Sequence, residues 1–338
     1  MPDVPATPET LWYGASTSKA QVAAALSKLI HSKDHPELAK GWSTPISSII
    51  HDDFVLEDDW ATNHITLDDA AAHRTGLSSH DMSLVREVNG TYTTPRDVVR
   101  NMRHLHMFAE PRLKYVYCNL MYVVFGHVLE VITGKWIGNV LKDLIWKPLG
   151  MSSTYIDLQE ALDASEHMAS GYFWDEEAEK YNEVPYMSVT EVAGAGGVIS
   201  NVNDYLKWAR ALLTKNEVFS PEVHKDIRTP RIIAGGSPEG DYLLYGLGWG
   251  RSIVHNHVVY KHAGGMHAYG CEVFWMPEIN YAVVAFANTA ISSNALELDI
   301  VYRLIEDRLQ IPAKDRIDSR STYVTQRLAA PAYYGFSK

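Results

Sequence analysis

A serine and a lysine near the start of the chain have the types and the spacing of a nucleophile and its base. Ser16 and Lys19 open a predicted helix that continues through residue 30. Side chains three residues apart lie on one face of a helix, so Lys19 can reach the hydroxyl of Ser16. The helix dipole at this end favours negative charge on the serine, and burial favours the neutral amine of the lysine. The pair therefore predicts covalent catalysis by Ser16.

Taken alone the pair is a weak signal, because a Ser-x-x-Lys pattern arises by chance about once in a chain of this length. The alternative is an N-cap serine followed by a solvated lysine. Two further sites strengthen the chemical interpretation. Tyr117 and Asn119 stand at the head of a predicted apolar helix, residues 120–130, and His262 and Gly264 end a predicted strand. As structural alternatives, Asn119 is a helix cap and His262 is a satisfied polar group.

The composition favours a small-molecule partner. The chain has 338 residues, of which 46% are hydrophobic, and a net charge of −11. An acidic chain without a basic run gives no support for a nucleic-acid partner or an anionic membrane. No apolar run reaches the about 18 residues of a membrane helix, and the first residues lack the features of a secretory leader. We therefore expect a cytoplasmic protein, with Cys118 and Cys271 buried and without a disulfide.

Hydrophobic periodicity predicts helices before residue 230, strands between about residues 242 and 289, and a last helix after them. Besides the two helices named above, helices are expected near residues 70–73, 95–105, 136–146, 203–213, 221–228 and 294–309. Strands are expected at residues 247–254, 258–262, 269–275 and 281–287, as an antiparallel meander. The glycine cluster at residues 193–197 lacks the spacing of a phosphate-binding loop, so it predicts a tight turn.

Metal and cofactor sites are not expected. His255 and His257 would share a strand face, whereas His104 and His106 would not share a helix face. No carboxylate or thiolate sits at ligand spacing beside either pair. The sequence thus indicates no metal and no cofactor.

In their order, Ser16-x-x-Lys19, Tyr117-x-Asn119 and His262-Ala263-Gly264 resemble the three motifs of the penicillin-recognising serine hydrolase superfamily. The class C β-lactamase branch, with its esterases and transesterases, is the better match. Its middle motif is Tyr-x-Asn, and its esterase-like members often carry a histidine in the third motif. The segments 72–77, 147–154 and 196–201 are also similar to this branch, and the resemblance covers about residues 7–309.

The resemblance implies an α/β, multi-domain fold of the β-lactamase/transpeptidase type. A mainly helical domain, residues 41–199, would pack on an antiparallel sheet flanked by helices, formed by residues 1–40 and 200–312. Residues 313–338 would form a tail. Members of the superfamily usually have a helix and two strands before the serine, and this chain would lack them.

The resemblance also implies a mechanism. Either Tyr117 or Lys19 removes the proton of Ser16, which attacks an ester, amide or lactam carbonyl. The backbone N–H groups of Ser16 and Gly265 would receive the oxyanion, and the small Gly264 and Gly265 let the substrate approach the strand edge. The acyl-enzyme is then released to water or to an alcohol or amine.

His262 decides the expected substrate. At this position of the third motif many members of the superfamily have a lysine, whose permanent positive charge would hold the carboxylate of a β-lactam or peptide. A histidine provides a weaker positive charge there. We therefore expect an esterase or transesterase that acts on a small ester, of the kind used in secondary metabolism. The alternatives are a β-lactamase or D-aminopeptidase/DD-peptidase-like amidase, and a non-catalytic binding protein. Since the pKa of histidine is about 6.5, acidic substrates should bind better as the pH falls through that value.

The expected last strand, Tyr281–Ala287, poses a pairing problem. In the superfamily the upstream strands pair with it, so here an apolar strand would have a free edge. A second copy of the chain or its own tail would then cover the edge. We expect self-association, and a truncated gene product is the remaining alternative.

Overall fold

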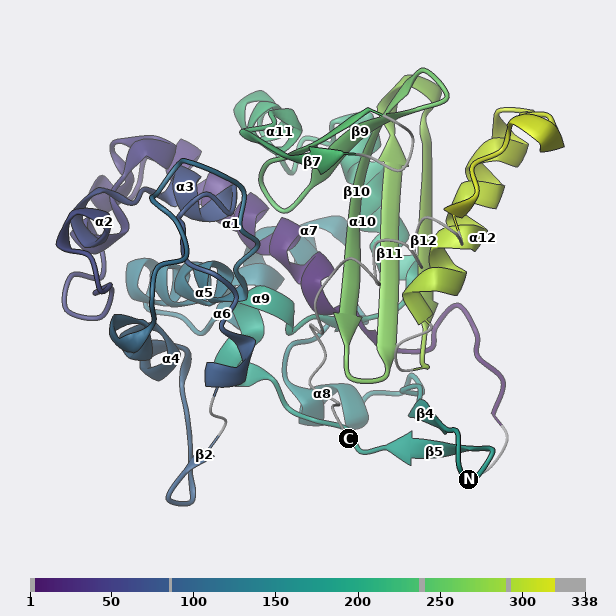
Figure 1. Cartoon of the computed structure of the whole chain (residues 1–338), viewed down its shortest axis with the longest axis horizontal. Helices are drawn as coiled ribbons and strands as arrows, with labels where there is room; N and C mark the ends of the chain where they lie inside the picture. The colour runs from purple at the N-terminus through teal and green to yellow at the C-terminus, as the bar shows by residue number, and fades with distance from the viewer. Residues whose placement is uncertain (1–3, 85–86, 237–240, 290–292, 320–338) are drawn as a thin grey trace.

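The computed structural model describes residues 4–84, 87–236, 241–289 and 293–319 (Figure 1). It mixes helices with an antiparallel sheet, as the sequence predicts. Figure 1 shows the sheet on one side of the molecule, the yellow helix α12 against its outer face, and most other helices on the opposite side. The purple helix α1 runs between the sheet and these helices. The division into domains at residues 41 and 200 stays a prediction.

The sheet is an antiparallel meander. In the described part of the chain its strand order is β12, β11, β10, β9, β8, β7. The strands are β7 (Ile232–Gly236), β8 (Tyr242–Tyr245), β9 (Gly250–Val254), β10 (His257–Met266), β11 (Tyr269–Met276) and β12 (Tyr281–Ala287). The predicted meander is confirmed. Strands β7 and β8 were not among the predicted strands. Both are short, and the glycines of β7 carry little strand signal.

The turn between β9 and β10 corrects one detail. His255 and Asn256 have φ values of 46° and 66°. Two consecutive left-handed residues are typical of a two-residue hairpin turn. The expectation that His255 and His257 share a strand face is therefore wrong, since His255 lies in the turn and His257 begins β10.

All α-helices of the described residues except α12 begin before residue 230. They are α1 (Ser18–Ser32), α2 (Asp59–His64), α3 (Leu67–Ala71), α4 (Pro95–Asn101), α5 (Asn119–Thr133), α6 (Ile137–Leu141), α7 (Lys147–Leu149), α8 (Leu158–Leu162), α9 (Ala193–Gly196), α10 (Val202–Thr214), α11 (Pro221–Arg228) and α12 (Ser293–Arg308). A π-helical turn, Lys142–Trp146, joins α6 to α7. Two short strands, β1 (Trp12–Tyr13) and β6 (Ile199–Ser200), pair beside the start of α1. Hairpins β2 (Glu87–Val88) with β3 (Thr91–Tyr92), and β4 (Gly171–Asp175) with β5 (Lys180–Val184), complete the described strands.

The predicted tight turn at the glycine cluster is wrong, because these residues form helix α9. A close backbone contact explains the glycines. A Cβ on Gly194 would lie 2.1 Å from the carbonyl oxygen of Tyr122 in α5. Only glycine allows α9 and α5 to approach so closely.

Helix α1 is buried on nearly every side. Its run of small residues, Ala23 to Ala25, is fully buried and lets neighbouring helices and the sheet pack close to it. Two of its buried polar side chains bond to other elements. The indole N–H of Trp146 donates to Oε1 of Gln21 at 2.7 Å, and the hydroxyl of Ser27 donates to Asp226 at 2.8 Å.

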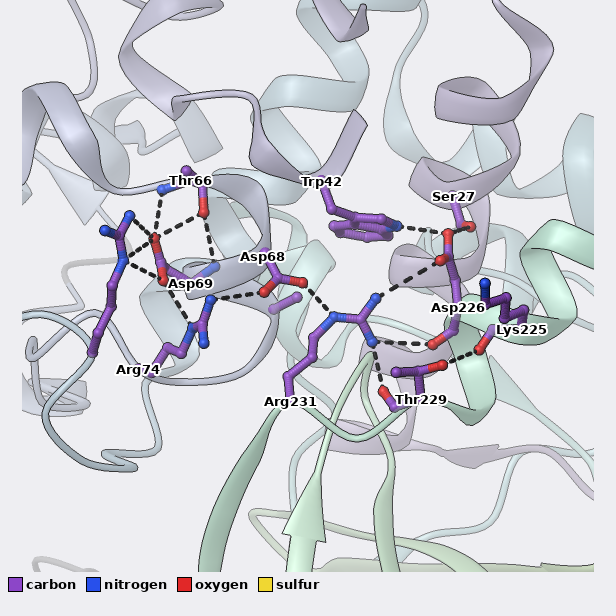
Figure 2. Close-up of polar contacts among 12 residues, drawn as sticks. Ser27, Trp42, Thr66, Asp68, Asp69, Arg74, Lys225, Asp226, Thr229 and Arg231 are labelled. Atoms are coloured by element: carbon purple, nitrogen blue, oxygen red, sulfur yellow. Dashed lines mark hydrogen bonds and ion pairs between the residues drawn. The ribbon is translucent and has the colours of Figure 1, made fainter. Parts of the chain in front are cut away.

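Asp226 of α11 and Arg231, just before β7, link the sheet to the helices (Figure 2). Oδ2 of Asp226 accepts hydrogen bonds from Ser27 of α1 at 2.8 Å and from Trp42 at 2.7 Å. The guanidinium of Arg231 binds Asp68 of α3 and lies 3.9 Å from Oδ1 of Asp226. The Arg231 side chain is only 9% exposed, and burying its charge without these carboxylates would be costly. The ion pairs therefore fix α3 and α11 against the start of β7.

The network continues through α3. Arg74 lies 2.8 Å from both Asp68 and Asp69 (Figure 2). Arg112 also binds Asp69, at 2.8 Å. Thr66 and Asp69 also form the capping box that begins α3. These contacts hold the chain that follows α3 in place.

No single helix in the described ranges is long and apolar enough to cross a membrane. By length and composition alone, α5 together with the segment Ile137–Leu149 passes such a test, although the pair is bent by 79°.

A buried carboxyl pair lies where α12 covers the sheet. Glu297 of α12 is 1% exposed and Glu272 of β11 is 5% exposed. Within the described residues neither carboxyl oxygen of Glu297 has a hydrogen-bond partner. Burial, and then the charge of Glu272, raises the pKa of Glu297 to about 9. Glu297 is thus protonated in the folded protein at neutral pH.

This pair predicts a pH-dependent stability. The pKa of Glu297 rises from 4.5 to about 9 on folding, so its stabilising contribution is complete below 4.5 and is lost as the pH rises towards 9. We expect Glu297→Gln to raise the melting temperature at about pH 8 and to change it less at about pH 5. Thermal unfolding at the two pH values checks this, with the exposed Glu37→Gln as control. A lower melting temperature for Glu297→Gln at the higher pH would contradict it.

Candidate active site

Ser16 lies in a single 3₁₀ turn, η1 (Ala15–Thr17), that leads directly into α1. The α-helix therefore begins two residues later than predicted. Of residues 14–20, only Ser16 is not fully buried. Ala15 has a φ of 45°, a left-handed conformation that a residue with a Cβ rarely adopts. Such strain just before a solvent-accessible serine is typical of functional turns.

Neighbouring side chains hold this turn. The Thr17 hydroxyl donates to the Gly14 carbonyl at 2.7 Å and lies 2.8 Å from the hydroxyl of Tyr205. The Ser18 hydroxyl donates to the Ala15 carbonyl at 2.6 Å and accepts the N–H of Val198 at 3.0 Å. The position of Ser16 is thus fixed from both sides.

Lys19 is completely buried directly beside the serine. Its Nζ lies 2.9 Å from Oγ of Ser16 and donates to the Ala195 carbonyl at 2.7 Å. Burial lowers the pKa of Lys19 to about 7, against the opposing charge of Asp81. Near neutral pH the amine is therefore able to lose its proton and to accept the proton of Ser16.

Tyr117 comes from the segment just before α5. The Nζ of Lys19 lies 5.1 Å from the centroid of the Tyr117 ring. The ring centroids of Tyr117 and His262 are 6.5 Å apart. The structure thus brings Ser16, Lys19, Tyr117 and His262 together, as the sequence predicts.

His73 is a site neighbour that the sequence did not single out. Its ring centroid lies 4.3 Å from that of Tyr117, and its Nδ1 accepts the backbone N–H of Cys118 at 3.1 Å. Burial, then the charge of Lys19, lowers the pKa of His73 well below its usual value. His73 is therefore neutral, with its proton on Nε2, and supports the Tyr117 ring. Its one signal in the sequence is its place in the framing segment 72–77.

Asn119 lies in the site but is not the helix cap. The N-cap residue of α5 is Cys118, and the side-chain amide of Asn119 donates to Oδ1 of Asp81 at 3.0 Å. Asp81 begins a 3₁₀ turn, Asp81–Ser83, and was not predicted as a site residue. A separation of 38 residues from Asn119 and a position in an irregular loop gave no pattern that could have found it.

His262 of β10 is buried and neutral. Its Nδ1 donates to the Ala263 carbonyl at 2.7 Å, so its Nε2 accepts from the hydroxyl of Tyr245 at 2.9 Å. Burial, then the charge of Lys19, lowers the pKa of His262 to about 3. The expected titration near pH 6.5 is therefore wrong. The physical reason for the low pKa is the burial of this side chain, which the sequence could not show.

Gly264 and Gly265 stand where β10 meets the serine turn. A Cβ on Gly264 would lie 2.3 Å from the Gly14 carbonyl oxygen, so no side chain fits there. Gly265 pairs with Gly270 of β11 and is exposed. The contact of Gly264 with Gly14 places this strand segment beside the residues that precede Ser16.

Cys118 and Cys271 are free and buried, as predicted. In the described ranges no three His, Cys, Asp or Glu side chains are grouped so that they could hold a metal ion.

Comparisons with known proteins agree with the geometry. The beta-lactamase family model matches residues 1–306. The chain is 38% identical, over 96% of its length, to the unguisins hydrolase ungD' of Aspergillus campestris (strain IBT 28561), and covers 61% of that protein. It is 37% identical to the unguisins hydrolase ungD of Aspergillus violaceofuscus (strain CBS 115571), over 96% of this chain and 60% of that protein. The chain thus spans about three fifths of the length of these curated relatives.

Solved structures show the same fold. The octameric penicillin-binding protein homologue from Pyrococcus abyssi matches with a TM-score of 0.79 and 21% identity, over 96% of this chain and 71% of that chain. The D-amino acid amidase from Ochrobactrum anthropi SV3 matches with a TM-score of 0.70 and 21% identity, over 90% of this chain and 94% of that chain. The predicted β-lactamase/transpeptidase-like fold is confirmed.

The pKa of Lys19 predicts how the reactivity of Ser16 depends on pH. Since the neutral amine accepts the serine proton, labelling of Ser16 by a fluorophosphonate should accelerate as the pH rises to about 7 and then level off. The histidines of the site stay neutral over this range, so Lys19 alone should set the midpoint. Labelling rates between about pH 5 and pH 9 measure this. A flat profile, or an unchanged midpoint in Lys19→Met, would count against it.

Proposed function

Because this chain belongs to the beta-lactamase family, whose members are serine hydrolases, we propose that it forms an acyl-enzyme on Ser16. One observation carries the proposal. Lys19 is completely buried, lies 2.9 Å from the serine oxygen and has a pKa lowered to about 7. A structural lysine would keep its ammonium group in water, whereas this amine is arranged as a base.

The proposed reaction uses the groups already described. Lys19, or Tyr117 held beside it, takes the proton of Ser16 while the serine oxygen bonds to the substrate carbonyl carbon. The backbone N–H groups of Ser16 and Gly265 donate to the oxyanion. Its collapse breaks the bond to the leaving group, which receives the proton. Water, or an alcohol or amine, then attacks the acyl-enzyme and releases the acyl group from Ser16.

A small ester is the substrate class that we propose first, for hydrolysis or transesterification. The support comes from the neutral His262, with a pKa of about 3, because it offers no positive charge to a substrate carboxylate at the third motif. A β-lactamase or peptidase that binds a carboxylate needs such a charge. The buried imidazole therefore disfavours acyl groups that carry a carboxylate.

Hydrolysis of an amide is the second candidate. It is supported by the fold neighbour from Ochrobactrum anthropi SV3, which is named a D-amino acid amidase. A non-catalytic binding protein is the rival from another class, and the arrangement of Lys19 against Ser16 counts against it. The cytoplasmic location stays a prediction.

Three substitutions test the proposal. We expect Ser16→Ala to abolish turnover of p-nitrophenyl butanoate and the fluorophosphonate adduct. Lys19→Met and Tyr117→Phe should each reduce kcat/KM on the order of 10²-fold or more, the usual cost of losing a general base. Chromogenic assays and intact-mass spectrometry measure both effects. The matched control is Ser48→Ala, which removes an exposed hydroxyl that contacts only the Pro45 carbonyl in the described structure.

Two outcomes would contradict the proposal in different ways. Full activity in Ser16→Ala would exclude the nucleophile. Absence of an adduct at every pH in the wild-type chain would favour the binding protein.

We also propose that β12 is covered by a second copy of the chain. In the described part of the structure β12 pairs only with β11. This strand is apolar, and without a second neighbour the backbone donors and acceptors on its outer side would be unpaired. The fold neighbour from Pyrococcus abyssi is octameric, so a protein with this fold can assemble from several copies. The chain after residue 312 is the other candidate to cover the edge.

Light scattering tests the pairing of β12. A second copy predicts twice the mass of the monomer or more, both for the full chain and for a chain that ends at Pro312. Covering by the tail predicts a monomer whose melting temperature falls when the tail is removed. A monomer with an unchanged melting temperature in both forms would exclude the two ideas.

A further inference from the structure

The ionisable groups around Ser16 give the site an unusual charge. Burial lowers the pKa of Lys19 to about 7 and that of His262 to about 3, and it keeps His73 neutral. None of these groups is a permanent cation at neutral pH. The carboxylate of Asp81 is the first of the charges that act on Lys19. Among the residues that the structure describes, the site therefore contains a carboxylate without a fixed positive charge beside it.

Contacts with the catalytic segment hold Asp81 in position. Its Oδ1 accepts from the amide of Asn119 at 3.0 Å. Two residues earlier, the Ser79 hydroxyl donates to the carbonyl of Tyr117 at 2.9 Å. The loop of Asp81 is thus attached to the segment that carries Tyr117 and Asn119. Because a carboxylate only accepts hydrogen bonds, Asp81 also fixes which end of the Asn119 amide faces it.

Asp81 has capacity for a further donor. It is partly exposed, and the side-chain contact that the described structure gives it is the one from Asn119. A carboxylate has about four acceptor positions, and Asn119 uses one of them. A charge-assisted bond from an ammonium group is stronger than one from a neutral donor, and more so where protein walls exclude water.

We propose that Asp81 is the binding site for a protonated amine of the substrate, next to the acyl carbonyl that Ser16 attacks. The proposal rests on the proposed function and narrows its substrate class to amino-acyl esters or amides. An ammonium group offers three donors to the free acceptor positions of Asp81. A substrate carboxylate would meet the charge of Asp81 instead and would be repelled.

Three p-nitrophenyl esters of nearly equal size separate these cases. The 3-aminopropanoyl ester carries a cation, the butanoyl ester a methyl group, and the succinyl ester an anion at the same distance from the carbonyl. We expect the wild-type kcat/KM for the cationic ester to exceed that for the butanoyl ester by about tenfold or more, chiefly through a lower KM. The succinyl ester should be the poorest substrate.

Asp81→Asn isolates the charge. Asparagine keeps a carbonyl oxygen that can accept from Asn119, so the loop contact is preserved. The variant should bring the ratio of kcat/KM for the cationic and butanoyl esters close to one. Because both esters use Lys19 equally, this ratio cancels any change in the basicity of Lys19. Labelling of Ser16 by a fluorophosphonate shows whether the variant still forms its site, and the exposed Asp34→Asn is the matched control that should keep the wild-type ratio.

The outcomes distinguish the two levels of the proposal. If wild-type protein hydrolyses the butanoyl ester and the cationic ester no faster, the role of Asp81 is overturned and the serine hydrolase stands. The same holds if labelled Asp81→Asn keeps the preference for the cationic ester. If none of the esters is hydrolysed and Ser16 takes no label, both proposals are wrong.

Discussion

The burial of one amine is the constraint on which the site depends. Lys19 has no contact with solvent, and this loss of hydration lowers its pKa to about 7. The alanines of α1 let its neighbours pack close and keep water away from the amine. The Ala195 carbonyl accepts a hydrogen bond from Nζ and so stabilises the buried group. The geometry of the serine turn would be of little use if water reached this side chain, because the amine would then stay protonated.

Separate layers of the fold supply the remaining groups. The serine turn leads into α1, Tyr117 and Asn119 stand at the start of α5, and His262 comes from β10. The ion pairs of Arg231 and Asp226 join these layers at a distance from the chemistry (Figure 2). Near the serine, Gly264 of β10 packs directly against Gly14 and so joins the sheet to the serine turn. A rigid site results from attachments on both sides of α1.

Local patterns predicted the elements, whereas the environment of each side chain could not be predicted. Helical and strand periodicity located α1, α5 and the meander, because these depend on the order of apolar residues. The pKa of His262 depends on burial by residues far along the chain, and the partnership of Asp81 with Asn119 crosses a loop without regular pattern. Helix α9 was missed because its glycines follow from a backbone contact with α5, not from their own propensity.

The contacts that form the site and hold its layers together join residues very far apart in the sequence. Lys19 and Ala195 are separated by 176 positions, Ser27 and Asp226 by 199, and Arg231 and Asp68 by 163. Loops of this length close slowly, and folds rich in such contacts form late and cooperatively. A chain that has made its local helices still holds Lys19 in water, fully charged and unreactive. The covalent chemistry that we propose for Ser16 therefore requires these long-range contacts, so a partly folded chain would not react with an acyl substrate.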